Sequence, residues 1–162
     1  MPMPIFLSLE GKNQGKIEGS CDIANYVGKI LVQELMHDVS IPRSPQTGLP
    51  TGKRVHGPIT ITKELDKSSP KLMQALCSGE QLKNVLLEFT RISPKGMEEV
   101  YYTIKLENSI IVSISDYSPI ALLKENDPMR HMEKVSFTYE KIIWTWVSDG
   151  IEAEDSWTAP KA

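Results

Sequence analysis

Histidine and cysteine are the side chains of this sequence that could serve as general bases, nucleophiles or metal ligands near neutral pH. The chain contains three histidines, His37, His56 and His131, and two cysteines, Cys21 and Cys77, which are far apart in the sequence. None of them stands in an H-E-x-x-H or C-x-x-C pattern, and no G-x-S-x-G pattern marks a serine nucleophile. The sequence therefore predicts no catalytic, cofactor-binding or metal-binding residue and favours a protein that is not an enzyme. One alternative stays open, namely a hydrolase whose site combines His56, His131 and nearby acids.

The two cysteines indicate the redox environment of the protein. Two isolated thiols do not make a disulfide framework, so folding in a reducing compartment is the simplest interpretation. Cys77 lies in a helical pattern, which favours a small buried residue over a reactive thiol. The sequence leaves open whether Cys21 and Cys77 pair.

The charged residues exclude some classes of partner. The net charge is −3, and the lysines and arginines are scattered, so we expect neither nucleic-acid binding nor adhesion to an anionic membrane. The acids at Glu98–Glu99 and near the C-terminus (Glu152, Glu154 and Asp155) favour solvated faces over acid–base pairs. No stretch is long and apolar enough for a transmembrane helix, and the N-terminus lacks the pattern of a classical signal peptide.

The stretch from Val135 to Trp146 is the longest strand pattern in the chain. The alternate apolar residues from Val135 to Tyr139 share one face, whereas those from Ile142 to Trp146 fall on the other. A strand with one buried face keeps its phase, because the side-chain period is two. Two explanations fit the switch: a bulge re-aims the second half, or the strand passes from one sheet into another. Either explanation predicts a central strand in a β barrel or sandwich.

Most other segments also have strand patterns. Residues 29–40 fit a helix or a strand by periodicity, and their β-branched residues favour the strand. The segments near 85–92, 100–106 and 110–114 predict a three-stranded meander, and residues 118–132 predict a long loop with a short helical turn at 120–123. We expect a mainly β fold in one domain, residues 1–162, built as a small barrel or sandwich of two sheets.

Residues 69–78 have the clearest helix pattern in the sequence. Ser69 is the expected N-cap, Pro70 falls at the first helical position, and Gly79 suits a left-handed C-terminal cap. An apolar stripe should dock this short helix on the side of the sheets; its residues are Leu72, Ala75 and Leu76, widened by Met73 and Cys77. Further on, the chain becomes acidic after Val147, and Trp157 is expected to hold this tail to the body.

Residues 41–53 hold three prolines and two glycines, which argues against regular structure. Loops of about a dozen residues are usually functional or mobile, so this one is the best local candidate for an interaction element. A solvated hairpin excursion is the alternative interpretation.

Several blocks of the sequence, taken in order, resemble the haemolysin-coregulated protein (Hcp) family, the tube subunit of the bacterial type VI secretion system. The blocks are Met1–Pro4, Leu9–Gly15, Leu31–Glu34, Arg54–Pro58, Ile61–Lys63, Asp66–Leu72, Ala75–Glu80, Tyr101–Leu106, Val135–Ile142 and Asp155–Trp157. They cover nearly the whole chain. Residues 22–28 depart from those relatives that carry a longer insertion there.

The resemblance implies a small β barrel that assembles into hexameric rings, which stack into a hollow tube inside a contractile sheath. It also implies a spike protein at the tip, effector proteins in the ring lumen, assembly in the cytoplasm and secretion without a classical signal peptide. It implies no catalytic activity, and we expect no room for an added toxin domain. The proline-rich loop, about residues 41–54, is then the candidate contact between rings, through Pro42, Arg43, Ser44, Pro45, Gln46, Thr47, Leu49 and Pro50.

A monomeric barrel that binds a small molecule, as lipocalins do, is the alternative function. Such a protein needs a barrel wide enough to leave a cavity. The large apolar residues of this chain are numerous enough to fill the interior instead.

Overall fold

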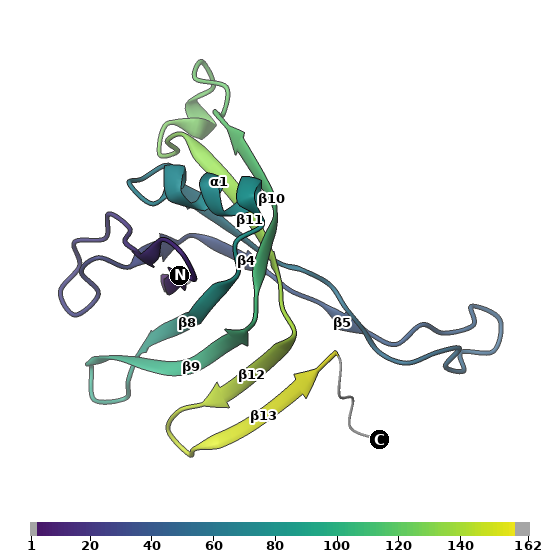
Figure 1. The fold of residues 1–162 in the computed structure, drawn as a ribbon. Coiled ribbons are helices and arrows are strands. Elements are labelled where there is room, and N and C mark those ends of the chain that lie inside the picture. Colours follow the sequence, from purple (N-terminus) through teal and green to yellow (C-terminus); the bar gives the residue numbers. More distant parts are fainter. Residues whose placement is uncertain (1–2, 158–162) are drawn as a thin grey trace.

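The structure is a computed structural model and describes residues 3–157. Its larger sheet has seven antiparallel strands. Their order is β13 (Ile151–Ser156), β12 (Lys141–Trp146), β9 (Glu98–Glu107), β8 (Leu82–Ile92), β1 (Ile5–Gly11) and β2 (Gly15–Ile17), with β3 (Ile30–Val32) pairing with the same strand, β1. Figure 1 shows this sheet below the helix, with β12 and β13 at its outer edge.

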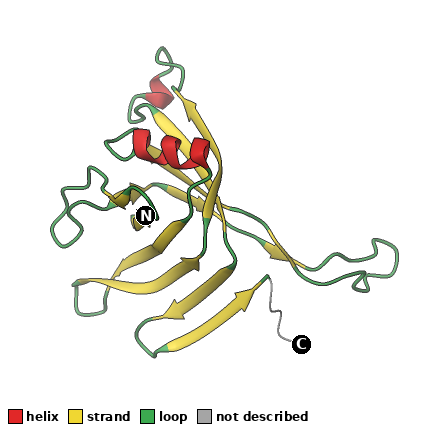
Figure 2. Ribbon diagram, viewed as in Figure 1, coloured by secondary structure: helices red, strands yellow, loops and turns green. Residues whose placement is uncertain are grey.

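The second sheet has four antiparallel strands, and neither sheet closes on itself. Its order is β10 (Ile110–Tyr117), β11 (Met132–Thr138), β7 (Ile59–Glu64) and β4 (Glu34–Met36). A separate two-stranded ribbon is formed by β5 (Val39–Ser40) and β6 (Val55–His56). The mainly β fold with more than one sheet and one α-helix is therefore confirmed, as an open arrangement of sheets (Figure 2).

The long strand pattern is divided between the two sheets. Its first part is β11 of the four-stranded sheet, its second part is β12 of the seven-stranded sheet, and the chain crosses at Tyr139–Glu140. Phe137 and Ile142 are both buried although their positions differ in parity. Because both sheets cover one core, a strand that changes sheet must change the face it buries. The explanation by a change of sheet is thus confirmed.

The chain makes the same kind of crossing at two other places. The strand predicted for residues 29–40 is present as β3, β4 and β5, and the crossing lies at Gln33 between the first two. The predicted meander is wrong in its third strand, because β10 leaves β9 and joins the four-stranded sheet. The turn there places Asn108 at φ 50°, and the Leu82 amide donates to the Ser109 carbonyl at 2.8 Å.

The core lies between the two sheets and is filled by aliphatic and aromatic side chains. Residues from both sheets contribute, and its fully buried members include Leu7, Leu9, Ile59, Ile61, Leu87, Leu106, Val135, Phe137 and Ile142. This packing occupies the space that a small-molecule-binding barrel would leave open.

Helix α1 (Ser69–Ser78) packs against β10 through Leu72 and Ala75 (Figure 1). The N-cap is Ser68, one residue before the predicted Ser69, and Gly79 has the expected left-handed backbone at φ 66°. Cys77 is exposed, so its prediction as a core residue was wrong. The buried residues of the helix are Leu72 and Ala75, which form one narrow stripe, and Cys77 lies outside that stripe.

The 118–131 segment is a loop, and its short helical turn is η1 (Lys124–Asn126), four residues later than predicted. The acidic tail is an ordered strand, because β13 pairs along its whole length with β12.

Candidate functional site

Residues 41–54, here called the arm, extend from the β5–β6 ribbon and project away from both sheets (Figure 1, right). Backbone hydrogen bonds hold the two sides of the arm together. The Ser44 amide donates to the Leu49 carbonyl, and the Thr51 amide donates to the Pro42 carbonyl, each at 2.8 Å. The arm is therefore an ordered hairpin even though its prolines keep it out of a regular ladder.

The turn at the tip of the arm follows from its sequence. The Gly48 amide donates to the Ser44 carbonyl at 2.8 Å, and Gly48 takes a left-handed backbone with φ 73°. A left-handed position favours glycine because a Cβ would clash there. The Ser44 hydroxyl also accepts weak hydrogen bonds from two amides of the turn.

The side chains of the arm face solvent. Seven of the eight residues predicted as contacts are exposed and Ser44 is half-buried; the exposed ones are Pro42, Arg43, Pro45, Gln46, Thr47, Leu49 and Pro50. The apolar side chains of Ile41 and Leu49 are 55% and 65% exposed. The projecting hairpin (Figure 1) therefore presents apolar side chains to solvent.

The arm is also cationic. It carries Arg43, Lys53 and Arg54, and no acid occurs between Asp38 and Glu64. Arg43 and Lys53 are exposed, whereas Arg54 is engaged at the base of the arm. The arm is therefore an exposed, cationic and partly apolar hairpin.

The base of the arm is tied to the C-terminal strand. The Arg54 guanidinium donates to both carboxylate oxygens of Asp155, at 2.8 and 3.1 Å, and to the Ser156 carbonyl at 2.7 Å. This fork geometry is the strongest common arrangement for an arginine–carboxylate pair. The hydrogen bond from Arg54, helped by one from His56, lowers the pKa of Asp155 to about 2.

The residues that fix the base of the arm, here called the anchor, are His37, Arg54, His56, Tyr139 and Asp155. His56 lies at the centre of the anchor and is buried. Its Nε2 is 2.6 Å from an Asp155 oxygen, and its Nδ1 is 2.6 Å from the hydroxyl of Tyr139. That hydroxyl is also 2.8 Å from Nε2 of His37. Burial, together with the charge of Asp155, raises the pKa of Tyr139, so the phenol stays protonated. A chain of hydrogen bonds thus joins β13, the arm, the crossing between the sheets and the end of β4.

Trp157 closes this anchor from the outside. Its ring centroid lies 5.0 Å from that of His56, and its amide donates to the Glu140 carbonyl at 3.0 Å. The expectation that Trp157 holds the acidic tail to the body is confirmed.

The structure does not bring His56 and His131 together. The His131 carbonyl accepts from the Leu65 amide at the end of β7, whereas His56 precedes the start of that strand. Six strand residues span about 20 Å, which is too far for a shared site. His56 meets His37, Tyr139 and Asp155 instead, a grouping that sequence spacing did not reveal. Within residues 3–157, no three His, Cys, Asp or Glu side chains group in a way that could hold a metal ion.

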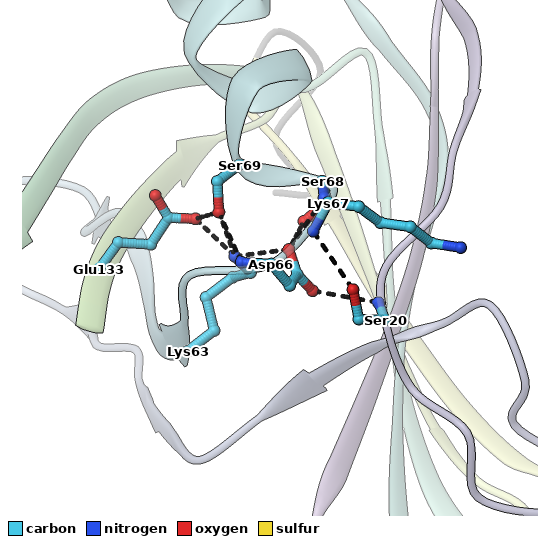
Figure 3. Close-up of polar contacts among 7 residues, drawn as sticks. All are labelled: Ser20, Lys63, Asp66, Lys67, Ser68, Ser69 and Glu133. Atoms are coloured by element: carbon cyan, nitrogen blue, oxygen red, sulfur yellow. Dashed lines mark hydrogen bonds and ion pairs between the residues drawn. The ribbon is translucent and has the colours of Figure 1, made fainter. Parts of the chain in front are cut away.

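A second polar cluster lies beneath the start of α1 (Figure 3). Register places Lys63 of β7 directly opposite Glu133 of β11 on the core face, and both side chains are buried. The Lys63 ammonium donates to Glu133, to the Ser69 hydroxyl at 3.1 Å and to Asp66 at 3.1 Å. Its three hydrogens are therefore matched by three acceptors, which is what a buried charge requires.

Asp66 connects this cluster to the N-terminal part of the chain. One of its oxygens accepts from the Ser68 amide at 2.9 Å, and the other accepts from the Ser20 amide at 3.3 Å. Although burial acts to raise the pKa of Asp66, the Ser68 hydrogen bonds and the Lys63 charge lower it. The carboxylate therefore stays ionised and fixes the start of the helix. The cluster is structural, because every reactive group in it is engaged by a neighbour.

The two clusters keep their ionisable side chains engaged by neighbouring groups. Both ring nitrogens of His56 have hydrogen-bond partners in the first cluster, and the Lys63 ammonium has its partners in the second. Within the described residues, no helix is long and apolar enough to cross a membrane. The arm, by contrast, faces outward (Figure 1).

Comparison with known proteins places the chain among type VI secretion system proteins. A family model described as "Type VI secretion system effector, Hcp" matches residues 6–146. A protein of Pseudomonas aeruginosa named major exported protein is 42% identical over 171 residues, covering 100% of this chain and 99% of that protein.

Solved structures with the same fold extend the match. A crystal structure of an Hcp protein has a TM-score of 0.88 at 34% identity and covers 95% of this chain and 97% of that one. The Hcp1 protein from the EAEC 042 pathovar of E. coli has a TM-score of 0.85 at 34% identity, with 96% and 99% covered.

Proposed function

This chain belongs to the Hcp family of type VI secretion system proteins, and we propose that it is the subunit of the system's inner tube. Six copies close into a ring, and rings stack into a tube inside the contractile sheath, below a spike protein at the tip. The subunit is made in the bacterial cytoplasm and expelled into target cells without a classical signal peptide. The ring lumen holds effector proteins before delivery.

The arm carries this proposal. Its apolar and cationic side chains face solvent in the single subunit, whereas its base is fixed by buried hydrogen bonds. A rigid base keeps the arm in one direction, so little conformational entropy is lost when a partner binds it. We therefore assign the arm to contacts between rings.

The open sheets support assembly in a second way. In the described structure β13, β10 and β4 each end a sheet and leave one edge without a neighbouring strand. Exposed strand edges favour pairing with another chain, and a closed ring of copies covers them. The subunit acts by forming this assembly, and we propose no catalytic role for it.

Negative-stain electron microscopy of a shortened arm tests the role of the arm. In the variant, residues 43–50 are replaced by Asn-Gly, which closes the hairpin where Thr51 bonds to Pro42. The wild type should form rings that stack at high concentration, and the variant should form rings that do not stack. Equal stacking by both proteins, with unchanged thermal unfolding, would remove the arm from ring–ring contact.

A further inference from the structure

One end of the seven-stranded sheet carries an aromatic surface that the subunit covers only in part. Its residues, here called the end patch, are Arg91 of β8, Tyr101 of β9, Trp146 of β12 and Ile151 of β13. The Arg91 guanidinium lies 4.9 Å from the Tyr101 ring centroid and 5.2 Å from that of Trp146. Ile151 pairs directly with Trp146 across the strands, which places both on one face, and it is 64% exposed.

The end patch is held rigidly. The Arg91 side chain donates to Glu99 at 2.9 Å, the Tyr101 and Trp146 rings meet edge to face at 5.6 Å, and the Val147 amide donates to the Tyr101 carbonyl at 3.0 Å. Tryptophan, tyrosine and arginine are the residues most enriched at the energetic centres of protein interfaces. The end patch holds all three residue types in fixed positions at one end of the sheet, so its composition is that of a binding surface.

We propose that the end patch receives the arm of a second copy of this chain. This proposal rests on the proposed tube role and names the surface that the arm meets. The arm presents three exposed prolines and Leu49. Proline-rich segments bind aromatic surfaces with little loss of entropy, because the proline backbone is already fixed.

Charge points to the same pairing. The arm has the exposed cations Arg43 and Lys53 and no acid. Exposed acids border the end patch at Glu98 in β9 and Asp149 in the β12–β13 turn. Opposite charges on the two surfaces favour their approach and disfavour contact between two arms.

The placement of the two surfaces makes the contact intermolecular. The arm projects to one side of the subunit, whereas the β8–β9 and β12–β13 turns beside the end patch lie on the opposite side (Figure 1). An arm therefore cannot reach the end patch of its own subunit. A contact between two unlike surfaces repeats in one direction, which suits a stacked assembly.

Disulfide trapping tests this pairing directly. Cys21 and Cys77 are first replaced by serine, and Leu49→Cys is then combined with Ile151→Cys. Oxidation of stacked rings should link most subunits into a ladder on non-reducing gels. The control pair combines Leu49→Cys with Lys105→Cys, an exposed position on the same sheet outside the patch, and should give only background linkage.

Introducing a positive charge into the end patch gives a second measurement that does not depend on cysteine. Ile151→Lys should raise the protein concentration needed for stacking by roughly 30-fold, because a cation then faces a cationic arm at an interface centre. Val27→Lys, in the loop between β2 and β3 with 72% exposure, is the matched control and should stack like wild type.

Two outcomes overturn the proposal, and a third bears on the proposed function on which it rests. Stacked rings without a 49–151 link would place the arm elsewhere. Protection of a cysteine at 151 from alkylation in single rings, again without that link, would assign the end patch to a neighbour in the same ring or to another protein. Absence of rings in the wild type would instead refute the proposed function.

Discussion

The hydroxyl of Tyr139 lies 2.6 Å from Nδ1 of His56, and this contact joins the base of the arm to the segment that crosses between the sheets. One assignment of protons gives each of these side-chain hydrogen bonds one donor and one acceptor. His56 donates from Nε2 to Asp155, Tyr139 donates to Nδ1 of His56, and His37 donates to the Tyr139 oxygen. The direction of the arm is therefore set by hydrogen bonds from parts of the chain about 100 residues away.

Tyr139→Phe should destabilise the protein. The substitution keeps the ring but leaves a buried nitrogen of His56 without its partner and removes the acceptor of His37. An unsatisfied buried group costs about 1–3 kcal/mol of unfolding free energy. Urea unfolding at neutral pH measures this change. Tyr117→Phe, which alters a half-buried tyrosine on β10 outside the anchor, is the control, and an equal effect of both variants would contradict this role of Tyr139.

Acid should weaken the anchor through His37. Burial, together with the charge of His56, lowers the pKa of His37 below its ordinary value of about 6.5. As the pH falls, the unfolded chain therefore takes up this proton first, and stability is lost below about pH 6.5. His37→Gln should reduce the fall in unfolding free energy between about pH 7 and about pH 5. His131→Gln is the matched control, and an unchanged slope in the His37 variant would show that its proton is not linked to folding.

Asp155 should stabilise the fold at neutral pH and lose this stabilising effect in acid. Its folded pKa is about 2, below the value of about 3.9 in an unfolded chain. The stability that it supplies is therefore complete above about pH 5 and disappears as the pH falls towards about 2. Asp155→Asn should be less stable than wild type at neutral pH, and the gap should close in acid. A gap that stays constant down to acid pH would mean that the ion pair with Arg54 is not its source; Asp149→Asn, an exposed turn residue, is the control.

Removing one partner of the buried Lys63–Glu133 pair should be costly. Lys63→Met leaves the Glu133 charge buried, and such a change costs about 3–5 kcal/mol of unfolding free energy. The double variant Lys63→Met with Glu133→Leu removes both charges and should recover much of that loss. Denaturant unfolding of the two single variants and the double variant gives the coupling between the residues. Strictly additive effects would contradict the pairing, and Lys105→Met controls for loss of an exposed lysine.

Local patterns were enough to predict most of the elements. The strand alternation, the proline and glycine that bound α1 and the composition of the arm each depend on neighbours in sequence, so they are visible without the fold. The phase switch after Tyr139 indicated either a bulge or a change of sheet, and the structure shows the change of sheet. The third strand of the meander was misplaced because a tight turn after β9 is equally compatible with pairing in either sheet.

The anchor and the buried ion pair were not predictable in the same way. Lys63 follows Ile59 and Ile61 at alternate positions, so its inward direction can be read from the sequence, but its partner Glu133 depends on strand register. His37, His56, Tyr139 and Asp155 meet only because the chain changes sheet at Gln33 and again after β11. The family resemblance gave the function class, whereas the atoms that fix the arm required the structure.

Native mass spectrometry of the purified chain tests the central proposal, the ring, most directly. The proposal predicts a dominant species with six times the 18.2 kDa mass of one chain, together with multiples of that species at higher concentration. A protein that stays at the mass of a single chain at every concentration tested would contradict it.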